Sequence, residues 1–134
     1  MKLNRMHVVL SACRTGADNQ SRTDELESRL LHEDFAYDAA EGCYKGEREA
    51  SFVVQVRSFP EVLELMQMSQ DFQQESVMLV DARGKGYILF NDAPGMVALG
   101  AFSTSFTEPL SEYVDAYTKV GDIYYYTYNF HREV

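Results

Sequence analysis

The segment that most constrains the fold is a run rich in β-branched residues at positions 52–57, with the sequence FVVQVR. Such residues favour a strand with at least one buried face. Short apolar runs at residues 8–10 and 77–80 have the same character. Segments with helical periodicity lie between these runs. The chain is therefore expected to interleave strands and helices around one core.

Two amphipathic helices are predicted between these strands. The first follows the polar residues 15–20; Ser21 and Thr23 are its candidate N-caps, and its apolar stripe consists of Leu26, Leu30 and Leu31. The second opens at residues 58–60, where Pro60 suits a first turn, and its inward face includes Val62, Leu63 and Met66. Both helices are placed to cover the sheet.

The remaining strands determine the expected fold class. Residues 83–86 (RGKG) turn the strand at 77–80 into a second strand at 87–90, which predicts a hairpin. The order strand, helix, strand, strand, helix, strand is typical of the split βαβ pattern of ferredoxin-like α+β folds. Extra strands are expected at the C-terminal end. A length of 134 residues fits a single domain, residues 1–134.

The C-terminal segment 123–130 is rich in tyrosine and is predicted to form one more strand. Its aromatic residues lie on both faces, so one face contacts solvent, the same chain or another subunit. We favour a subunit contact, because amphipathic tyrosine surfaces are common at interfaces. An edge strand that packs on its own sheet is the alternative.

Charge and composition exclude several functions. With 21 acidic and 12 basic residues the net charge is −9, which disfavours binding to a phosphate backbone. Acidity instead fits solubility, a cationic small molecule, or mimicry of DNA. No apolar run approaches the ~20 residues of a membrane span, and the N-terminus lacks the apolar core of an export signal. We therefore expect a cytoplasmic protein in which Cys13 and Cys43 are reduced and hold no metal.

Three polar segments at strand ends are candidates for chemistry. Residues 11–15 and 19–22 carry Arg14 and Arg22 beside a helix start, which suits a carboxylate or phosphate; capping in a solvated loop is the alternative. The second is residues 42–52, in which Glu49 lies at or just inside a strand, where it faces either solvent or a ligand. The third is residues 71–76. None contains a phosphate loop or a nucleophile elbow.

Taken in order, these segments resemble a known family. Residues 8–14 (VVLSACR), 19–22 (NQSR), 42–44 (GCY), Glu49 and residues 74–77 (QESV) resemble the phage-encoded S-adenosylmethionine lyases, formerly called hydrolases and known as antirestriction enzymes. The similarity runs from about residue 7 to residue 102. The segment between Tyr44 and Glu49 is shorter than in some members, so Tyr37 is an alternative to Tyr44.

The resemblance implies a ferredoxin-like core similar to that of PII signalling proteins, assembled as a homotrimer with the substrate between subunits. It implies cleavage of S-adenosylmethionine to 5′-methylthioadenosine and homoserine lactone, with the substrate's own carboxylate as nucleophile and without cofactor or metal. Glu49 and Tyr44 match the catalytic positions. The implied substrate-binding residues are Ser11, Ala12, Arg14, Arg22, Gln74 and Glu75.

Three alternatives stay open at this stage. A lyase for a conjugate of S-adenosylmethionine with AMP would need a basic subsite, for which Arg14 and Arg22 are the candidates. A PII-like protein would bind an adenine nucleotide without catalysis. An acidic antirestriction protein would mimic DNA, although the acids here are scattered. Neither nucleic acid nor a membrane is expected as a partner.

Overall fold

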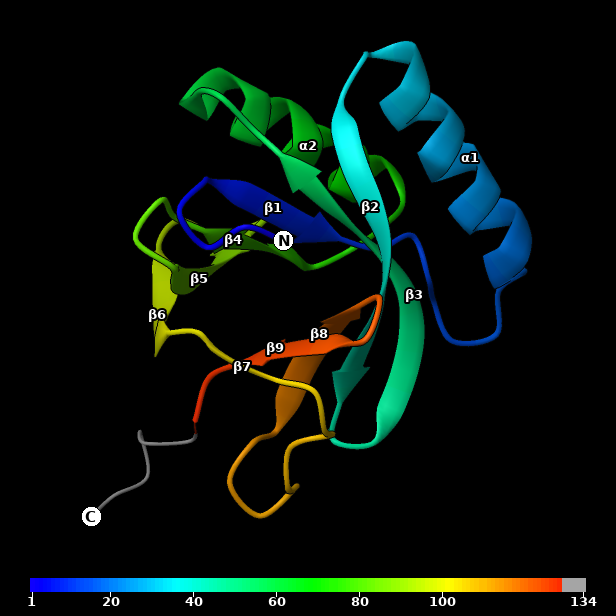
Figure 1. The fold of residues 1–134 in the computed structure, drawn as a ribbon. Helices are drawn as coiled ribbons and strands as arrows, with labels where there is room; N and C mark the ends of the chain where they lie inside the picture. Colours follow the sequence, from blue (N-terminus) through cyan, green and yellow to red (C-terminus); the bar gives the residue numbers. More distant parts are fainter. Residues whose placement is uncertain (129–134) are drawn as a thin grey trace.

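The computed structural model describes residues 1–128. Two helices and nine strands follow one another along this part of the chain (Figure 1). In chain order they are β1 (His7–Leu10), α1 (Asn19–His32), β2 (Ala36–Tyr44), β3 (Glu47–Gln55), α2 (Phe59–Asp71), β4 (Ser76–Val80), β5 (Lys85–Phe90), β6 (Met96–Ala101), β7 (Ser103–Ser105), β8 (Ala116–Val120) and β9 (Ile123–Tyr126).

The strands form one sheet in the order β6-β5-β4-β1-β3-β2-β8-β9-β7. All of these neighbouring pairs run antiparallel. The outermost strands β6 and β7 are separated in the chain by one residue, Phe102, whose N–H donates to the Gly84 carbonyl at 2.9 Å. The sheet therefore curls so that its two edge strands, β6 and β7, are joined by a single residue. It forms a nearly closed barrel (Figure 1).

The expected ferredoxin-like, PII-like split βαβ core is therefore wrong. The C-terminal strands are not additions to a finished core, because β8 pairs along β2 from Glu41–Lys119 to Tyr44–Ala116 and continues the sheet into β9 and β7. The sequence prediction omitted β2 and began β3 too late. The β2–β3 hairpin is nine residue pairs long, and its far half provides the edge on which the barrel is completed.

The hairpin turn is formed by Lys45 and Gly46, which have φ values of 50° and 88°. Positive φ at both central residues matches the right-handed twist of the flanking strands, which is why such turns connect hairpins. The other predicted hairpin is confirmed, because β4 pairs with β5 from Ser76–Phe90 to Val80–Gly86.

Helix α1 begins earlier than predicted. Its N-cap is Asp18, whose carboxylate accepts a hydrogen bond from the Ser21 N–H at 3.2 Å, so Ser21 and Thr23 lie within the helix. Leu26 and Leu30 are buried as expected, but Leu31 is 62% exposed. The earlier start does not change which face of the helix is buried. Leu31 is exposed because it lies 100° around the helix from the buried Leu30.

Helix α2 has Pro60 in its first turn, as predicted. Its inward face holds Val62 and Leu65, whereas Leu63 is half-exposed. A spacing of three residues keeps Val62 and Leu65 on one face, and this places Leu63 at its edge.

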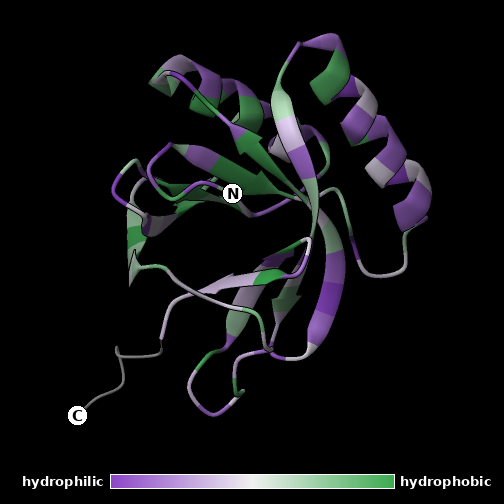
Figure 2. Cartoon of the chain, in the orientation of Figure 1, coloured by the Kyte–Doolittle hydropathy of each residue, from purple (hydrophilic) through white to green (hydrophobic). Residues whose placement is uncertain are grey.

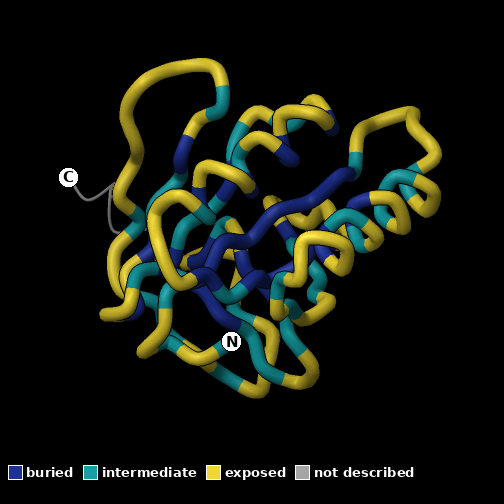
Figure 3. The backbone as a smooth tube through the Cα atoms, turned by 90° about the horizontal axis from the view of Figure 1, so that it is seen from above, coloured by how far each residue is buried: buried dark blue, intermediate teal, exposed yellow. Residues whose placement is uncertain are grey.

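The buried residues form two clusters. Figure 2 shows hydrophobic residues along β1 and at the end of β3, and Figure 3 shows buried stretches of backbone running through the middle of the fold. The helix-side core lies between the helices and the sheet and includes Val8, Leu10, Leu26, Leu30, Phe52, Val54, Val62 and Leu65. The tyrosine cluster lies at the far end of the hairpin and comprises Cys43, Val114, Tyr117 and Tyr126, with Tyr124 packed against it. Both cysteines of the chain are free thiols.

Strand β9, at the start of the tyrosine-rich segment, packs on its own sheet. Strand β9 lies between β8 and β7 and is not an edge, and the side chains of Tyr125 and Tyr126 are buried within the chain. The predicted strand was longer than the observed one; its last two residues, Asn129 and Phe130, lie outside the described residues. Packing on the same chain is therefore correct for Tyr125 and Tyr126, although β9 is not the expected edge strand, and the subunit contact stays a prediction.

Candidate active site

The segment after β1 is where the three polar regions meet. The Ser11 hydroxyl donates to the Ala50 carbonyl at 2.8 Å, and it accepts from the Cys13 N–H at 3.0 Å. These bonds join the end of β1 to β3. The side chain of Ser11 and that of Ala12 are buried, so this segment is held in one position.

The third polar region is joined to the same segment by Gln74. Its side-chain amide donates to the Cys13 carbonyl at 2.9 Å and to the Phe72 carbonyl at 3.3 Å. Glu75 is exposed, and its carbonyl accepts from the Asn91 N–H at 2.9 Å. Gln74 thus links the loop after α2 to the segment after β1, while the Glu75 side chain lies on the surface.

The two arginines of the first region lie in different environments. Arg22 donates through Nε to the Ala12 carbonyl at 2.6 Å and through Nη2 to the Phe72 carbonyl and Gln73 Oε1. Its guanidinium also lies over the Phe72 ring, 5.6 Å from the centroid. Arg14 is exposed. Arg22 therefore holds three segments of the fold together, and Arg14 is the arginine that faces solvent.

A pocket of about 240 Å³ opens between the first turns of α1 and strand β3. It is lined by Cys13, Asn19, Gln20, Thr23, Arg48, Glu49 and Ala50. The Cys13 Sγ lies 3.9 Å from the Thr23 hydroxyl and 3.6 Å from the Ala50 carbonyl. Of the predicted site residues, Glu49 lines this pocket directly. Ser11 and Gln74 support its wall through Ala50 and Cys13.

The carboxyl group of Glu49 has a raised pKa. Burial is the main cause, and the negative charge of Glu47 acts in the same direction, whereas the nearby Ser11 hydroxyl lowers the pKa. The residue as a whole is exposed, so the carboxylate of Glu49 is only partly desolvated, and it is open to a cationic group or to hydroxyls of a ligand. This is the chemical property expected of a residue that binds a positively charged substrate.

Tyr44 and Tyr37 lie at opposite ends of β2. Tyr44 is 59% exposed, and pairs with Glu47 across the hairpin, which places it on the same sheet face as Glu49. The Tyr37 hydroxyl donates to Glu27 Oε2 at 2.8 Å, and its ring packs edge-on against Phe52 at 5.5 Å. Tyr37 thus belongs to the contact between α1 and the sheet, and Tyr44 is the tyrosine available at the open end of the hairpin.

Six residues that line the pocket were not among the predicted site residues: Cys13, Asn19, Gln20, Thr23, Arg48 and Ala50. All of them except Thr23 lie in the first two polar segments, and Thr23 was considered only as a cap. Arg48 directly precedes Glu49 in the charged run 47–49. Alternation along a strand places the two side chains on opposite faces.

A larger hollow of about 430 Å³ lies between α1 and α2. Its lining includes Glu33 and Glu64, and burial together with a hydrogen bond to Glu33 raises the pKa of Glu64. None of the predicted site residues lines this hollow. We therefore assign the site to the smaller pocket, where the three polar segments meet.

Within residues 1–128, no group of three or more His, Cys, Asp or Glu side chains is arranged to hold a metal ion. Neither helix in this part of the chain is long and apolar enough to cross a membrane.

Comparison with known proteins gives a family. Among curated proteins, none matches this chain. The sequence model of the S-Adenosylmethionine lyase family matches residues 8–128. This match covers the segment after β1, the hairpin that carries Glu49 and the loop that carries Gln74. The chain therefore belongs to the S-adenosylmethionine lyase family.

Proposed function

We propose that the protein cleaves S-adenosylmethionine to 5′-methylthioadenosine and L-homoserine lactone. Family membership supports lyase activity on S-adenosylmethionine in general. The observation that carries the proposal is the family match over residues 8–128, which includes all the candidate site residues.

The proposed step needs no nucleophile from the protein. One oxygen of the substrate's carboxylate forms a bond to its γ-carbon, and the bond from that carbon to sulfur breaks. The sulfur keeps the electron pair and becomes a neutral thioether, while the lactone keeps the ammonium group. The step consumes no water, so the protein has only to orient the substrate and exclude solvent. Orientation lowers the activation barrier by up to about 7–11 kcal/mol in favourable systems.

The candidate residues have separate roles in this proposal. Glu49 binds the positive charge or the hydroxyls of the substrate. Tyr44 packs against the substrate from the same face of the hairpin. Ser11, Ala12 and Gln74 keep the wall of the pocket in place. The net charge of −9 favours a substrate that carries sulfonium and ammonium charges.

We further propose that the protein is a homotrimer in which a neighbouring subunit completes each site. The family resemblance supports this, as do the open pocket and the 59% exposure of Tyr44. Sedimentation at micromolar concentration should give three times the 15.3 kDa mass of one chain. A monomer that still turns over S-adenosylmethionine would contradict the shared site. In this proposal the enzyme depletes the methyl donor in the cytoplasm of a phage host, as an antirestriction activity.

The test is incubation with S-adenosylmethionine in ¹⁸O-labelled water, with chromatography and mass spectrometry of the products at early times. The proposed route gives lactone first, and label enters homoserine only at the carboxyl group when the lactone hydrolyses. Direct attack by water would place label on the side-chain hydroxyl and would disprove the mechanism. Reactions without protein correct for spontaneous breakdown. Absence of methylthioadenosine above that background would disprove the function and leave a nucleotide-binding or DNA-mimicking role.

A further inference from the structure

A side chain outside the pocket holds the Gln74 loop, residues 72–75, which connects α2 to β4. Asn91 directly follows β5, and Glu75 directly precedes β4. The Asn91 backbone N–H donates to the Glu75 carbonyl at 2.9 Å, and its side-chain Nδ2 donates to the Gln74 carbonyl at 2.9 Å. The same Nδ2 donates to the hydroxyl of Ser69, a fully buried residue of α2, at 2.9 Å. Asn91 thus binds two consecutive carbonyls of the loop and links them to the helix.

The orientation of the Asn91 amide is fixed by its partners. A carbonyl oxygen only accepts hydrogen bonds, so the nitrogen of the amide must face Gln74. This leaves Asn91 Oδ1 buried and without a hydrogen-bond partner among the described residues. An unpartnered buried acceptor lowers the stability of the folded chain. A polar residue at this position therefore costs stability, and what it provides is the contact with the Gln74 loop.

The Gln74 loop needs such contacts because its backbone is strained. Gln73 has a φ of 58°, in the left-handed region that residues other than glycine rarely adopt. From α1, Arg22 Nη2 donates to the Phe72 carbonyl and to Gln73 Oε1. From the end of β5, Asn91 donates to the Gln74 carbonyl. The strained residue is therefore held on both sides.

The Gln74 loop contacts the wall of the pocket. Gln74 Nε2 donates to the Cys13 carbonyl at 2.9 Å. The Cys13 side chain lines the pocket, and its Sγ lies 3.6 Å from the Ala50 carbonyl. A continuous series of hydrogen bonds thus runs from the end of β5 to the pocket wall, although Asn91 lies outside the pocket lining.

We propose that Asn91 is a positioning residue of the lyase site. By holding the Gln74 loop, it fixes the pocket wall at Cys13 in the geometry that orients the substrate. This inference rests on the proposed function and deepens it. The proposed step depends on the orientation of the substrate's own carboxylate, so a small displacement of the wall reduces its rate. Asn91 acts through Gln74 and touches no reacting atom.

The two free thiols of the chain report separately on the pocket and on the fold. Cys13 lines the pocket, whereas Cys43 is buried in the tyrosine cluster. The probe is iodoacetamide, and mass spectrometry of the digested protein gives the labelling rate of each thiol. We expect Asn91→Ala to be labelled several-fold faster than the wild-type protein at Cys13 and at the same rate at Cys43. Equal acceleration at both thiols indicates a loss of global stability and overturns the inference, as does an unchanged rate at Cys13.

Kinetics test the same link during turnover. Asn91→Ala should lower kcat about 10-fold with little change in KM, as expected when one hydrogen bond that orients the bound substrate is lost. Added to Gln74→Ala, it should cause no further loss, because its effect passes through Gln74. Asn91→Asp keeps the shape but replaces the donor nitrogen by an oxygen, so it should resemble Asn91→Ala at alkaline pH. Additive losses, or wild-type rates in Asn91→Asp, contradict the proposal.

The first control lies within the same network. Ser69→Ala removes the other partner of the Asn91 amide and leaves its bond to the Gln74 carbonyl in place. It should keep the wild-type kcat and the wild-type labelling rate at Cys13. Losses as large as those of Asn91→Ala would mean that the amide acts through α2, and the inference would be wrong.

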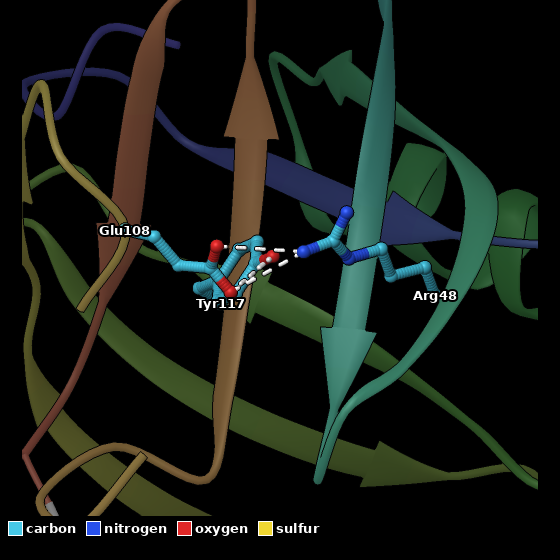
Figure 4. Close-up of polar contacts among 3 residues, drawn as sticks. All are labelled: Arg48, Glu108 and Tyr117. Carbon is cyan, nitrogen blue, oxygen red and sulfur yellow. Dashed lines mark hydrogen bonds and ion pairs between the residues drawn. The ribbon is translucent and has the colours of Figure 1, made fainter. Parts of the chain in front are cut away.

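The second control lies at the far end of the hairpin, beside the other thiol. The Tyr117 hydroxyl donates to Glu108 Oε2 at 3.3 Å, and Arg48 Nη2 lies 3.4 Å from each carboxylate oxygen of Glu108 (Figure 4). Cys43 belongs to the same cluster as Tyr117. Glu108→Gln weakens this contact and should leave the labelling of Cys13 unchanged. Faster labelling of Cys13 in this variant would show that any weakened contact opens the pocket, which contradicts a specific role of Asn91.

The inference and the proposed function fail in different ways. Labelling needs no turnover, so it tests the link even in a protein that forms no lactone. Wild-type labelling of Asn91→Ala in a protein that forms lactone overturns the inference alone. Thermal melting identifies the folded variants. If the Asn91 variants do not fold, Gln74→Leu replaces them, because it removes the amide that reaches Cys13: faster labelling of Cys13 alone supports the inference, and an unchanged rate overturns it.

Discussion

The two ends of the β2–β3 hairpin are stabilised in different ways. At the helix end, the side chains of the helix-side core are almost completely excluded from solvent. At the far end, the tyrosine cluster is small and is bordered by the exposed ion pair of Arg48 and Glu108. The pocket lies where the two ends meet on β3. The difference suggests that one end maintains the fold, while the other has polar groups that are free to exchange partners.

The largest expected effect tests this division through stability. Leu65→Ala removes a fully buried side chain from the helix-side core and should lower the free energy of unfolding by about 2–5 kcal/mol. Leu110→Ala, the same substitution at a 64% exposed position before β8, should change it by less than about 0.5 kcal/mol. Urea titration monitored by circular dichroism measures both. Similar losses at the two positions would show that the exposed end also supports the fold.

The next effect concerns activity at the meeting point. Glu49→Gln keeps the shape of the side chain and removes its charge, and it should lower turnover of S-adenosylmethionine by about 10²–10³-fold. Glu47→Gln, two residues away on the same face, is the matched control and should retain most activity. Wild-type turnover in Glu49→Gln would transfer the acidic role to Glu47 or Glu75.

The Glu49 variant should not lose stability. Because burial raises the pKa of Glu49 in the folded protein, the charged form is disfavoured there. Its contribution is therefore unfavourable at neutral pH and disappears as the pH falls below the pKa of the unfolded chain. A melting temperature equal to or above that of the wild-type protein is the expected result.

A smaller pair of effects separates the two tyrosines. Tyr37→Phe removes the hydrogen bond to Glu27 and should lower stability by about 0.5–1.5 kcal/mol while activity is retained. Tyr44→Phe should lower activity by about 10-fold, as expected if one catalytic hydrogen bond is lost, and leave the melting temperature unchanged. The reverse pattern would assign Tyr37 to the site.

The smallest expected effect is a change in pH dependence. If Glu49 acts as a carboxylate, kcat/KM should fall with decreasing pH around a pKa above the ordinary value of 4.5. Because the Ser11 hydroxyl lowers that pKa, Ser11→Ala should move the acidic limb to higher pH. Rates from pH 4 to 8 with saturating and limiting substrate measure the shift. Movement to lower pH would contradict the assigned contact.

The sequence predicted those parts of the fold whose local pattern is strong. Strands at residues 8–10, 52–57 and 77–80 consist largely of apolar and β-branched residues, and each is found within β1, β3 or β4, apart from the last two positions of the second. Strand β2 has the sequence AYDAAEGCY, which contains no β-branched residue. It is a strand because both neighbours pair with it, and this cannot be read from its own residues.

The site could be predicted to a similar extent. The order of the polar segments suggested that residues 11–14, Glu49 and Gln74 act together, and the hydrogen bonds of Ser11 and Gln74 bring these segments into contact. Arg48 could not be assigned, because its partner Glu108 is 60 residues away and is positioned by the loop before β8. Arg22 suggested an anion site, but its guanidinium binds backbone carbonyls.

The position of β1 has a consequence for the order of folding. It precedes the other eight described strands in the chain, yet it lies inside the sheet, where His7 pairs with Gln55 on one side and Val80 on the other. The hairpin of β2 and β3 forms through a local turn. Strand β1, in contrast, can pair on both sides only after two long loops have closed. A chain that ends before β4 leaves one edge of a wholly buried strand unpaired. Such a fragment should aggregate during synthesis instead of persisting as a folded piece.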